Sequence, residues 1–184
     1  MVGVRCNRPL TRIIGAQYDW DFMVGKLTER EMWNRNWNVN TAGTHVMTST
    51  FVPLLLHSSD PRLLFVTSGT ATLAGSANQD LAVNRHPPRG WPKPGPSVPA
   101  YRSAKCGLNM MMREWHRILM EDGVKVWCIS PGFLATGLGG HPETLRKMGA
   151  GEPEVAGPFI RSVLEGERDE DVGKVLTRDG IQPW

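Results

Sequence analysis

Apolar residues recur at helical spacing between residues 29 and 57 of this 184-residue chain. Thr28 and Glu31 stand three apart at the start of this stretch, which is the spacing of a capping box at a helix N-terminus. The pattern therefore predicts a long helix from Glu29 to about His57, kinked near Pro53 because proline cannot donate the helical hydrogen bond. Its apolar members include Met32, Val39, Val46, Phe51 and Leu54.

Three short apolar runs, at residues 62–68, 124–130 and 173–177, have the composition of buried strands. Residues 101–121 and 153–165 have helical patterns instead. The resulting order of helix, strand, helix, strand, helix, strand is typical of an α/β fold, in which crossover helices join the strands of a parallel sheet.

One segment, residues 79–100, carries neither pattern and is rich in proline. Proline at this density excludes a regular helix or a central strand. A loop of this length inside a compact domain is usually functional, so we expect it to lie over the site. Its prolines are Pro87, Pro88, Pro92, Pro94, Pro96 and Pro99.

Size and charge narrow the class of protein. A chain of 184 residues suits one domain, residues 1–184, with a single core. The formal net charge is +3 and the basic residues are scattered, so we expect neither nucleic acid nor an anionic membrane as a partner. No apolar run approaches the roughly 20 residues that a membrane-spanning helix needs.

Cysteine and histidine usage argues against a metal site. Cys6, Cys106 and Cys128 are too few and too far apart for a disulfide framework or a zinc site. The five histidines have no ligand-like spacing either. We therefore expect no metal and a reduced, cytoplasmic compartment.

Candidate chemistry is concentrated on two residues at the start of the second predicted helix. Tyr101 and Lys105 are four apart, so they share a helix face. A free phenol has a pKa near 10, and a neighbouring ammonium would lower that pKa toward neutrality. Tyr101 could then donate a proton to a carbonyl oxygen or accept one from an alcohol. The structural alternative is a packed tyrosine beside a solvated lysine.

Two further polar residues complete the candidate site. Ser68 ends the strand at residues 62–68, and ligands of open α/β sheets bind at the carboxyl ends of strands. Its hydroxyl could hold the substrate oxygen, and Asn40 on the long helix could anchor a water that passes protons to Lys105. Each could instead be structural, as a turn former or a helix-surface residue. None of these groups supplies a hydride, so the chemistry requires a redox cofactor such as a nicotinamide.

Four motifs, in this order, resemble the short-chain dehydrogenase/reductase family. They are Trp33 with Asn40 seven residues later, Phe65-Val66-Thr67-Ser68, Tyr101-Arg102-Ser103-Ala104-Lys105-Cys106-Gly107 and Pro131-Gly132-Phe133-Leu134-Ala135-Thr136. The match extends from about Trp33 to Thr136, and the following tail is similar to a fungal branch. The resemblance implies a Rossmann-like parallel sheet with flanking helices.

The resemblance also implies roles for individual residues. Tyr101 would be the proton donor and acceptor, Ser68 the anchor of the substrate oxygen and Asn40 the water-relay residue. Lys105 would assist Tyr101 and bind the cofactor ribose, and Tyr101 would also contact the cofactor. The nicotinamide would be lined by Pro131, Gly132, Leu134 and Thr136.

The activity implied is interconversion of a ketone and a secondary alcohol on a small organic substrate with NADP or NAD, NADP being favoured. A role in fungal secondary metabolism fits this resemblance. The long helix and the tyrosine helix would pack against a second copy in a homo-oligomer.

The chain departs from the family at its start, where a glycine-rich nucleotide turn is expected after a first strand. Arg12-Ile13-Ile14-Gly15-Ala16 resembles a later part of the fold, so the sequence is interpreted as N-terminally truncated. Residues 132–140 are glycine-rich but lack phosphate-loop spacing, and we interpret them as a mobile post-strand loop. An alternative function follows: a non-catalytic remnant of the family that acts through dimerisation and binds NADPH or NADH weakly.

Overall fold

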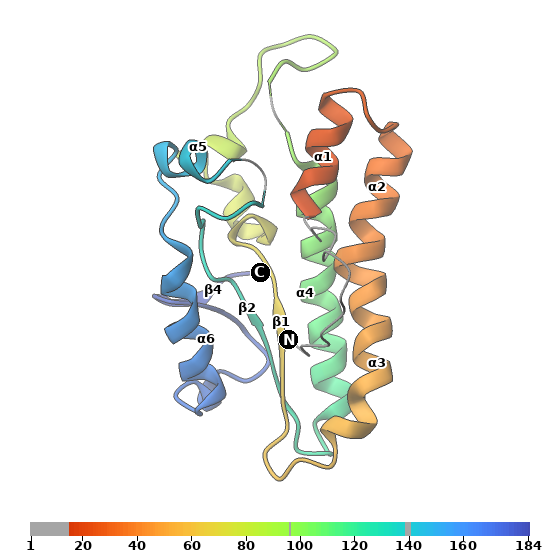
Figure 1. The fold of residues 1–184 in the computed structure, drawn as a ribbon, viewed down its shortest axis with the longest axis vertical. Helices are drawn as coiled ribbons and strands as arrows, with labels where there is room; N and C mark the ends of the chain where they lie inside the picture. The colour runs from red at the N-terminus through yellow and green to blue at the C-terminus, as the bar shows by residue number, and fades with distance from the viewer. Residues whose placement is uncertain (1–14, 96, 139–140) are drawn as a thin grey trace.

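The computed structural model describes residues 15–95, 97–138 and 141–184. A four-stranded sheet separates α1 to α4 on one face from α6 on the other, and the short helix α5 lies beyond the carboxyl ends of the strands (Figure 1). The expected α/β fold with a predominantly parallel sheet is confirmed. The segment that resembles a later part of the family fold, residues 12–16, lies mostly outside the described residues.

The long predicted helix is present as three consecutive helical segments, α2 (Glu29–Trp37), the π-helix η1 (Asn38–Ala42) and α3 (Gly43–Leu55). Its capping box is confirmed, because the Glu31 N–H donates to the Thr28 hydroxyl and the Thr28 N–H donates to the Glu31 carboxylate. A further helix, α1 (Gly15–Met23), precedes it and packs against α2 and α4. The hydrophobic pattern did not predict α1.

The strands are β1 (Arg62–Val66), β2 (Lys125–Ile129), β3 (Val175–Thr177) and β4 (Gly180–Gln182), in that spatial order. The first three are parallel, and β4 returns antiparallel to β3. This hairpin was not predicted, although Asp179-Gly180 is a turn signal and Gly180 has a φ of +149°, which favours glycine.

Helix α4 (Pro99–Leu119) packs one face against the sheet and supplies much of the core. Its buried apolar residues contact β1, β2 and β3 residues in one cluster. On the opposite face of the sheet, α6 (Ala156–Leu164) covers Trp127, Ile129 and Leu176. The short helix α5 (Pro142–Lys147) follows the loop after β2. No helix within the described residues is long and apolar enough to cross a membrane.

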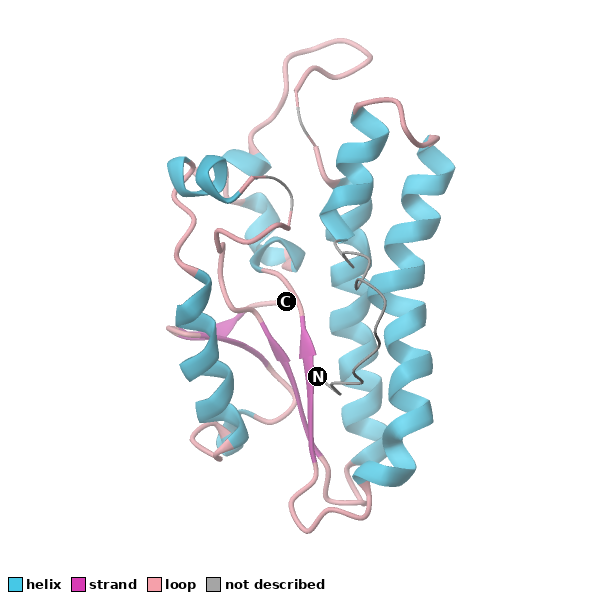
Figure 2. Cartoon of the chain, in the orientation of Figure 1, coloured by secondary structure: helices cyan, strands magenta, loops and turns pink. Residues whose placement is uncertain are grey.

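Short helical turns and loops gather beyond the carboxyl ends of β1 and β2 (Figure 2). The predicted loop at residues 79–100 contains one short turn, η4 (Ala82–Asn84), and its last two residues begin α4. The rest projects past the helices at one end of the molecule (Figure 1), and Trp91 on it is 88% exposed. The other turns are η2 (Gly69–Ala71), η3 (Ala74–Ala77), η5 (Pro153–Val155) and η6 (Asp169–Asp171).

Truncating a methionine tests how much of the core depends on α4. Met112 is 0% exposed in the core cluster, whereas Met148 is 68% exposed. We expect Met112→Ala to lower the free energy of unfolding by about 2–5 kcal/mol through the cavity it leaves. Met148→Ala, the matched control, should change it by less than about 0.5 kcal/mol. Urea unfolding followed by circular dichroism measures both, and equal effects would contradict this packing.

Candidate active site

The parallel register of β1 and β2 brings their carboxyl ends side by side. Val66 pairs with Ile129, and the Thr67 N–H donates to the Ile129 carbonyl at 2.8 Å. Ser68 and the segment after Ser130 therefore lie at one edge of the sheet, where ligands of such sheets bind. The candidate site is built on this edge.

Helix α4 places Tyr101 over the same edge. Tyr101 is 8% exposed, and the Ser68 hydroxyl lies near enough to its phenol to lower the pKa of Tyr101. The hydrogen bonds of the Ser68 hydroxyl go to Thr70, whose N–H donates to the Ser68 Oγ at 3.2 Å. The predicted phenol and hydroxyl thus face each other from two different elements.

Lys105 lies one turn further along α4 and is half-buried. Its Nζ is 6.0 Å from the centre of the Tyr101 ring and donates to the Val66 carbonyl at 2.8 Å. The structure therefore brings together three of the predicted residues, Tyr101, Lys105 and Ser68.

The prediction that Lys105 lowers the pKa of Tyr101 is wrong, because the pKa of this phenol is raised. Burial raises the pKa of Tyr101, Ser68 opposes this, and the nearby carboxylate of Asp19 raises it further. Burial also lowers the pKa of Lys105 to about 8. Lys105 therefore loses its proton before the phenol does, so it is uncharged at the pH where the phenol ionises.

Asn40 lies on the π-helix η1, where it is 6% exposed, and its Nδ2 donates to the Asn36 carbonyl at 3.0 Å. The next residue, Thr41, donates its hydroxyl to the Ala104 carbonyl of α4 at 3.0 Å. These contacts place Asn40 on the helix that packs directly against the tyrosine helix. π-Turns of this kind are frequent at functional sites.

The four residues expected to line a nicotinamide, Pro131, Gly132, Leu134 and Thr136, follow β2 at the same edge. Gly132 has a φ of +106°, and a Cβ added there would meet no atom within 4 Å. Leu134 pairs with Gly151, and the Thr136 hydroxyl accepts the Leu138 N–H. The four residues thus lie in a loop at the carboxyl edge of the sheet, and a side chain at Gly132 would meet no neighbouring atom. No glycine-rich turn precedes β1 in the described part of the chain.

Sequence reasoning missed a buried polar contact between β1 and α4. The Thr67 hydroxyl donates to the Asn109 Oδ1 at 2.6 Å, and both residues are 4% exposed. On the other side of the strand end, the Gln182 Nε2 donates to the Ser68 carbonyl at 3.2 Å. Asn109 follows Tyr101 by eight residues on the same helix face, so helical spacing could have indicated it.

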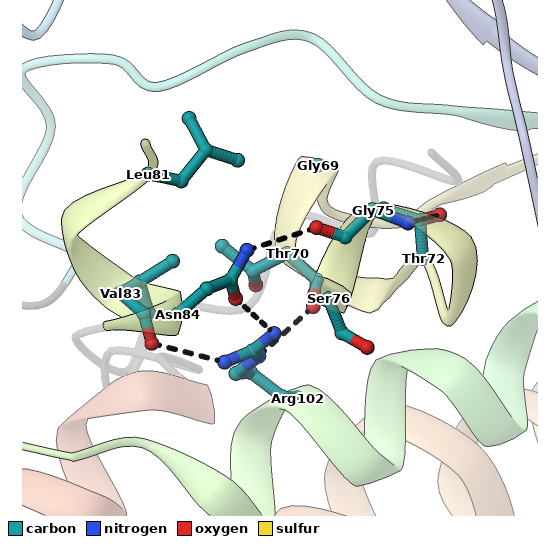
Figure 3. Close-up of a pocket in the computed structure, with 9 residues that line it drawn as sticks. All are labelled: Gly69, Thr70, Thr72, Gly75, Ser76, Leu81, Val83, Asn84 and Arg102. Carbon is teal, nitrogen blue, oxygen red and sulfur yellow. Dashed lines mark hydrogen bonds between the residues drawn. The ribbon is translucent and has the colours of Figure 1, made fainter. Parts of the chain in front are cut away.

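Arg102 was predicted only as a member of the tyrosine motif, with no role of its own. In the structure it connects α4 to the turns η2 and η4 (Figure 3). Its guanidinium donates to the carbonyls of Thr70 and Val83 and, at 2.7 Å, to the Asn84 Oδ1. The cavity between these segments is about 20 Å³, which is room for roughly one water molecule. It is too small for an organic substrate. Within the described residues, no group of His, Cys, Asp or Glu side chains could hold a metal ion.

Comparison with known proteins identifies the class. A family model described as short chain dehydrogenase matches residues 90–144. The short-chain dehydrogenase/reductase eupG from a Phoma species is 46% identical over 179 residues, covering 92% of this chain and 64% of that protein. The corresponding protein tropE from Talaromyces stipitatus is 49% identical over 164 residues, covering 84% of this chain and 59% of that protein.

A solved structure supports the same fold. An NADPH-bound carbonyl reductase from chicken fatty liver has a TM-score of 0.63 at 17% sequence identity, covering 88% of this chain and 60% of its own. These matches confirm the resemblance of the motifs, and we assign the chain to the short-chain dehydrogenase/reductase family of oxidoreductases. The chain spans less than two thirds of the length of these relatives.

The burial of Lys105 predicts a pH-dependent stability. Its pKa is about 8 in the folded chain against 10.5 for a free lysine, so the unfolded chain binds the proton more tightly between these values. Lys105 should therefore contribute a rise in stability across this window, of about 1–2 kcal/mol after allowance for partial exposure. Burial of Cys128 opposes this rise, because it raises the pKa of that thiol to about 12. In Lys105→Met this rise should disappear.

The measurement is urea unfolding at a series of pH values, compared between the native chain and the variant. Lys93→Met is the matched control, because the Lys93 ammonium also donates to a backbone carbonyl, that of Pro88 at 3.0 Å, but is exposed. An identical pH dependence in native and Lys105→Met chains would show that the ammonium is not buried.

Proposed function

We propose that this protein is an NAD(P)-dependent oxidoreductase that interconverts a ketone and a secondary alcohol on a small organic substrate. The observation that carries the proposal is the meeting of the Tyr101 phenol with the Ser68 hydroxyl at the carboxyl edge of the sheet, with the Lys105 amine 6.0 Å from the ring.

Each residue has a defined task in the reduction of a ketone. Ser68 donates a hydrogen bond to the carbonyl oxygen and orients it toward the phenol. Tyr101 gives its proton to that oxygen as negative charge develops there, leaving a phenolate. Lys105 returns a proton to the phenolate before the next turnover, and Asn40 would anchor a water that passes this proton to Lys105. In alcohol oxidation Tyr101 would accept the proton of the hydroxyl group, and Lys105 would pass a proton outward.

A nicotinamide cofactor, when bound, would supply or accept the hydride at the substrate carbon. The loop from Pro131 to Thr136, with Gly132 and Leu134, would hold the nicotinamide, and Lys105 the adjoining ribose. NADP is favoured over NAD. The NADPH in the chicken carbonyl reductase supports this preference by fold similarity alone.

The proposed setting is the reduced cytoplasm, with a role in fungal secondary metabolism. The three cysteines support the first, since Cys106 and Cys128 are free thiols in the described residues. The fungal origin of the relatives eupG and tropE supports the second. The proline-rich segment 79–100 is proposed to border the substrate, because its short turn η4 is tied to Arg102, the neighbour of Tyr101.

Replacement of the phenol tests the mechanism. We expect Tyr101→Phe to reduce the rate of ketone reduction at least about hundredfold, because the variant keeps the ring but has no proton to donate. Tyr18→Phe removes the chain's other tyrosine, which lies on α1, and is the matched control with an expected rate near that of the native chain. The assay follows the absorbance of the reduced nicotinamide with a panel of aliphatic and aromatic ketones. A Tyr101→Phe variant that keeps more than a tenth of the activity would rule out this proton donor.

A second candidate function, dimerisation without catalysis, is favoured by one observation. Helices α3 and α4 expose large apolar side chains that nothing in the described residues covers. A face of this kind is typical of an interface between copies. The residues are Val46, Met47, Leu54, Met110 and Ile118, with exposures between 51% and 65%.

A charged substitution on that face tests self-association. Leu54 on α3 is 65% exposed, and Leu164 at the end of α6 is 49% exposed on the other side of the sheet. We expect Leu54→Glu to weaken the dimer at least tenfold, because a carboxylate would be buried between the copies. Leu164→Glu should leave the dissociation constant unchanged. Sedimentation equilibrium measures both, and a monomeric native chain would exclude this interface.

A further inference from the structure

The carboxylate of Asp19, on α1, is the most completely buried charged group near the candidate site. Asp19 is 0% exposed. Its Oδ1 accepts the Ala100 N–H at 3.1 Å, and its Oδ2 accepts the Tyr101 N–H at 3.2 Å and the Asn36 Nδ2 at 2.9 Å. All three donors come from other elements, so the carboxylate connects α1 to α2 and α4.

These contacts give α4 an N-terminal cap from outside its own sequence. Val98, which precedes the helix, makes no side-chain cap, and the first helical residue is Pro99. The free N–H groups of the first turn are therefore satisfied by Asp19 alone among the described side chains. The capped turn is the one that carries Tyr101, so the orientation of the phenol depends on Asp19.

The same carboxylate extends toward the relay residue Asn40. Asn36 is 0% exposed, and it donates to Asp19 through its side chain while its backbone carbonyl accepts from the Asn40 Nδ2 at 3.0 Å. The Asn36 Oδ1 is buried without a partner in the described residues, as an acceptor for an internal water would be. A continuous line of polar groups thus runs from Asn40 through Asn36 and Asp19 to the Tyr101 backbone.

The negative charge of Asp19 also affects the pKa of the Tyr101 phenol. A carboxylate raises the pKa of a phenol near it by repelling the charge of the phenolate, and Asp19 raises the pKa of Tyr101 in this way, although less than burial does. Within the described residues, the groups that face the phenol are Asp19 from α1, Lys105 from its own helix and the neutral Ser68 after β1. Lys105 is directed to the Val66 carbonyl instead.

We infer that Asp19 is a positioning residue, which fixes the first turn of the tyrosine helix and so orients the Tyr101 phenol at the carboxyl edge of the sheet. The inference rests on the proposed role of Tyr101.

The chain offers a direct spectroscopic test, because it contains only two tyrosines, Tyr18 and Tyr101. In a Tyr18→Phe background, the ultraviolet absorbance of tyrosinate reports the ionisation of Tyr101 alone. We expect its midpoint to lie above 10, because burial and Asp19 both oppose ionisation. Adding Asp19→Asn should raise the ionisation constant roughly threefold or more. The measurement needs neither substrate nor cofactor. A negative result for Asp19 would therefore leave the proposed activity standing, and a loss of the proposed activity would leave this result interpretable.

Asp21→Asn is the matched control. It removes the same charge from the same helix, but Asp21 bonds to Gln17 and lies 3.8 Å from the Lys26 ammonium, away from α4. We expect it to leave the Tyr101 midpoint unchanged. An unchanged midpoint in a folded Asp19→Asn chain, judged by circular dichroism at each pH, would overturn the inference.

A second measurement uses the native sequence, in case Asp19→Asn does not fold. Burial raises the pKa of Asp19 above its ordinary value of 3.8. As the pH falls from neutrality, the backbone amide resonances of Ala100 and Tyr101 should therefore shift together in nuclear magnetic resonance spectra, with one midpoint above 3.8. Amide positions that stay constant down to about pH 4 would overturn the inference.

Discussion

The burial of one face of α4 against the parallel sheet is the interaction on which the remaining structure depends. Along its last three turns this face is apolar, with Met112, Trp115 and Leu119 in the core cluster. Along its first turns the same face carries Tyr101 and Lys105. The site is therefore the polar continuation of the core stripe, and its geometry is fixed by packing free energy that the apolar end supplies.

This arrangement explains the protonation states of the site. A phenol and an amine placed on a buried stripe both lose hydration, which favours their neutral forms. The pKa of Tyr101 is therefore raised and that of Lys105 is lowered to about 8. Simple proximity of the two groups on a helix predicted the opposite for Tyr101, because that reasoning included Coulomb attraction and left out desolvation. A bound ligand that brings its own charge would change this balance directly.

Local patterns in the sequence predicted the helix and strands that carry the site. The residues that these patterns missed are held by contacts between segments far apart in the sequence. Helical spacing located Tyr101 and Lys105, and apolar runs located the three parallel strands. Asp19 gave no signal, because the helix that holds it is short and its donors are 17, 81 and 82 residues away in the chain. Gln182 reaches Ser68 across 114 residues through a hairpin strand of three residues, too short for a periodic pattern. Burial of a carboxylate is likewise a property of the assembled fold alone.

The edge of β1 shows how the sheet and the site are connected. The Thr67 N–H points to β2, and since the N–H and C=O of one peptide unit point in opposite directions, the Val66 carbonyl points away from β2. In the described residues no strand pairs with β1 on that side. The Val66 carbonyl accepts a hydrogen bond from the Lys105 Nζ instead. A strand that paired along this edge would bring its own backbone donors to β1 and compete for that acceptor. The Lys105 amine would then be free to contact another group, so the pairing of β1 determines which acceptor Lys105 can bind.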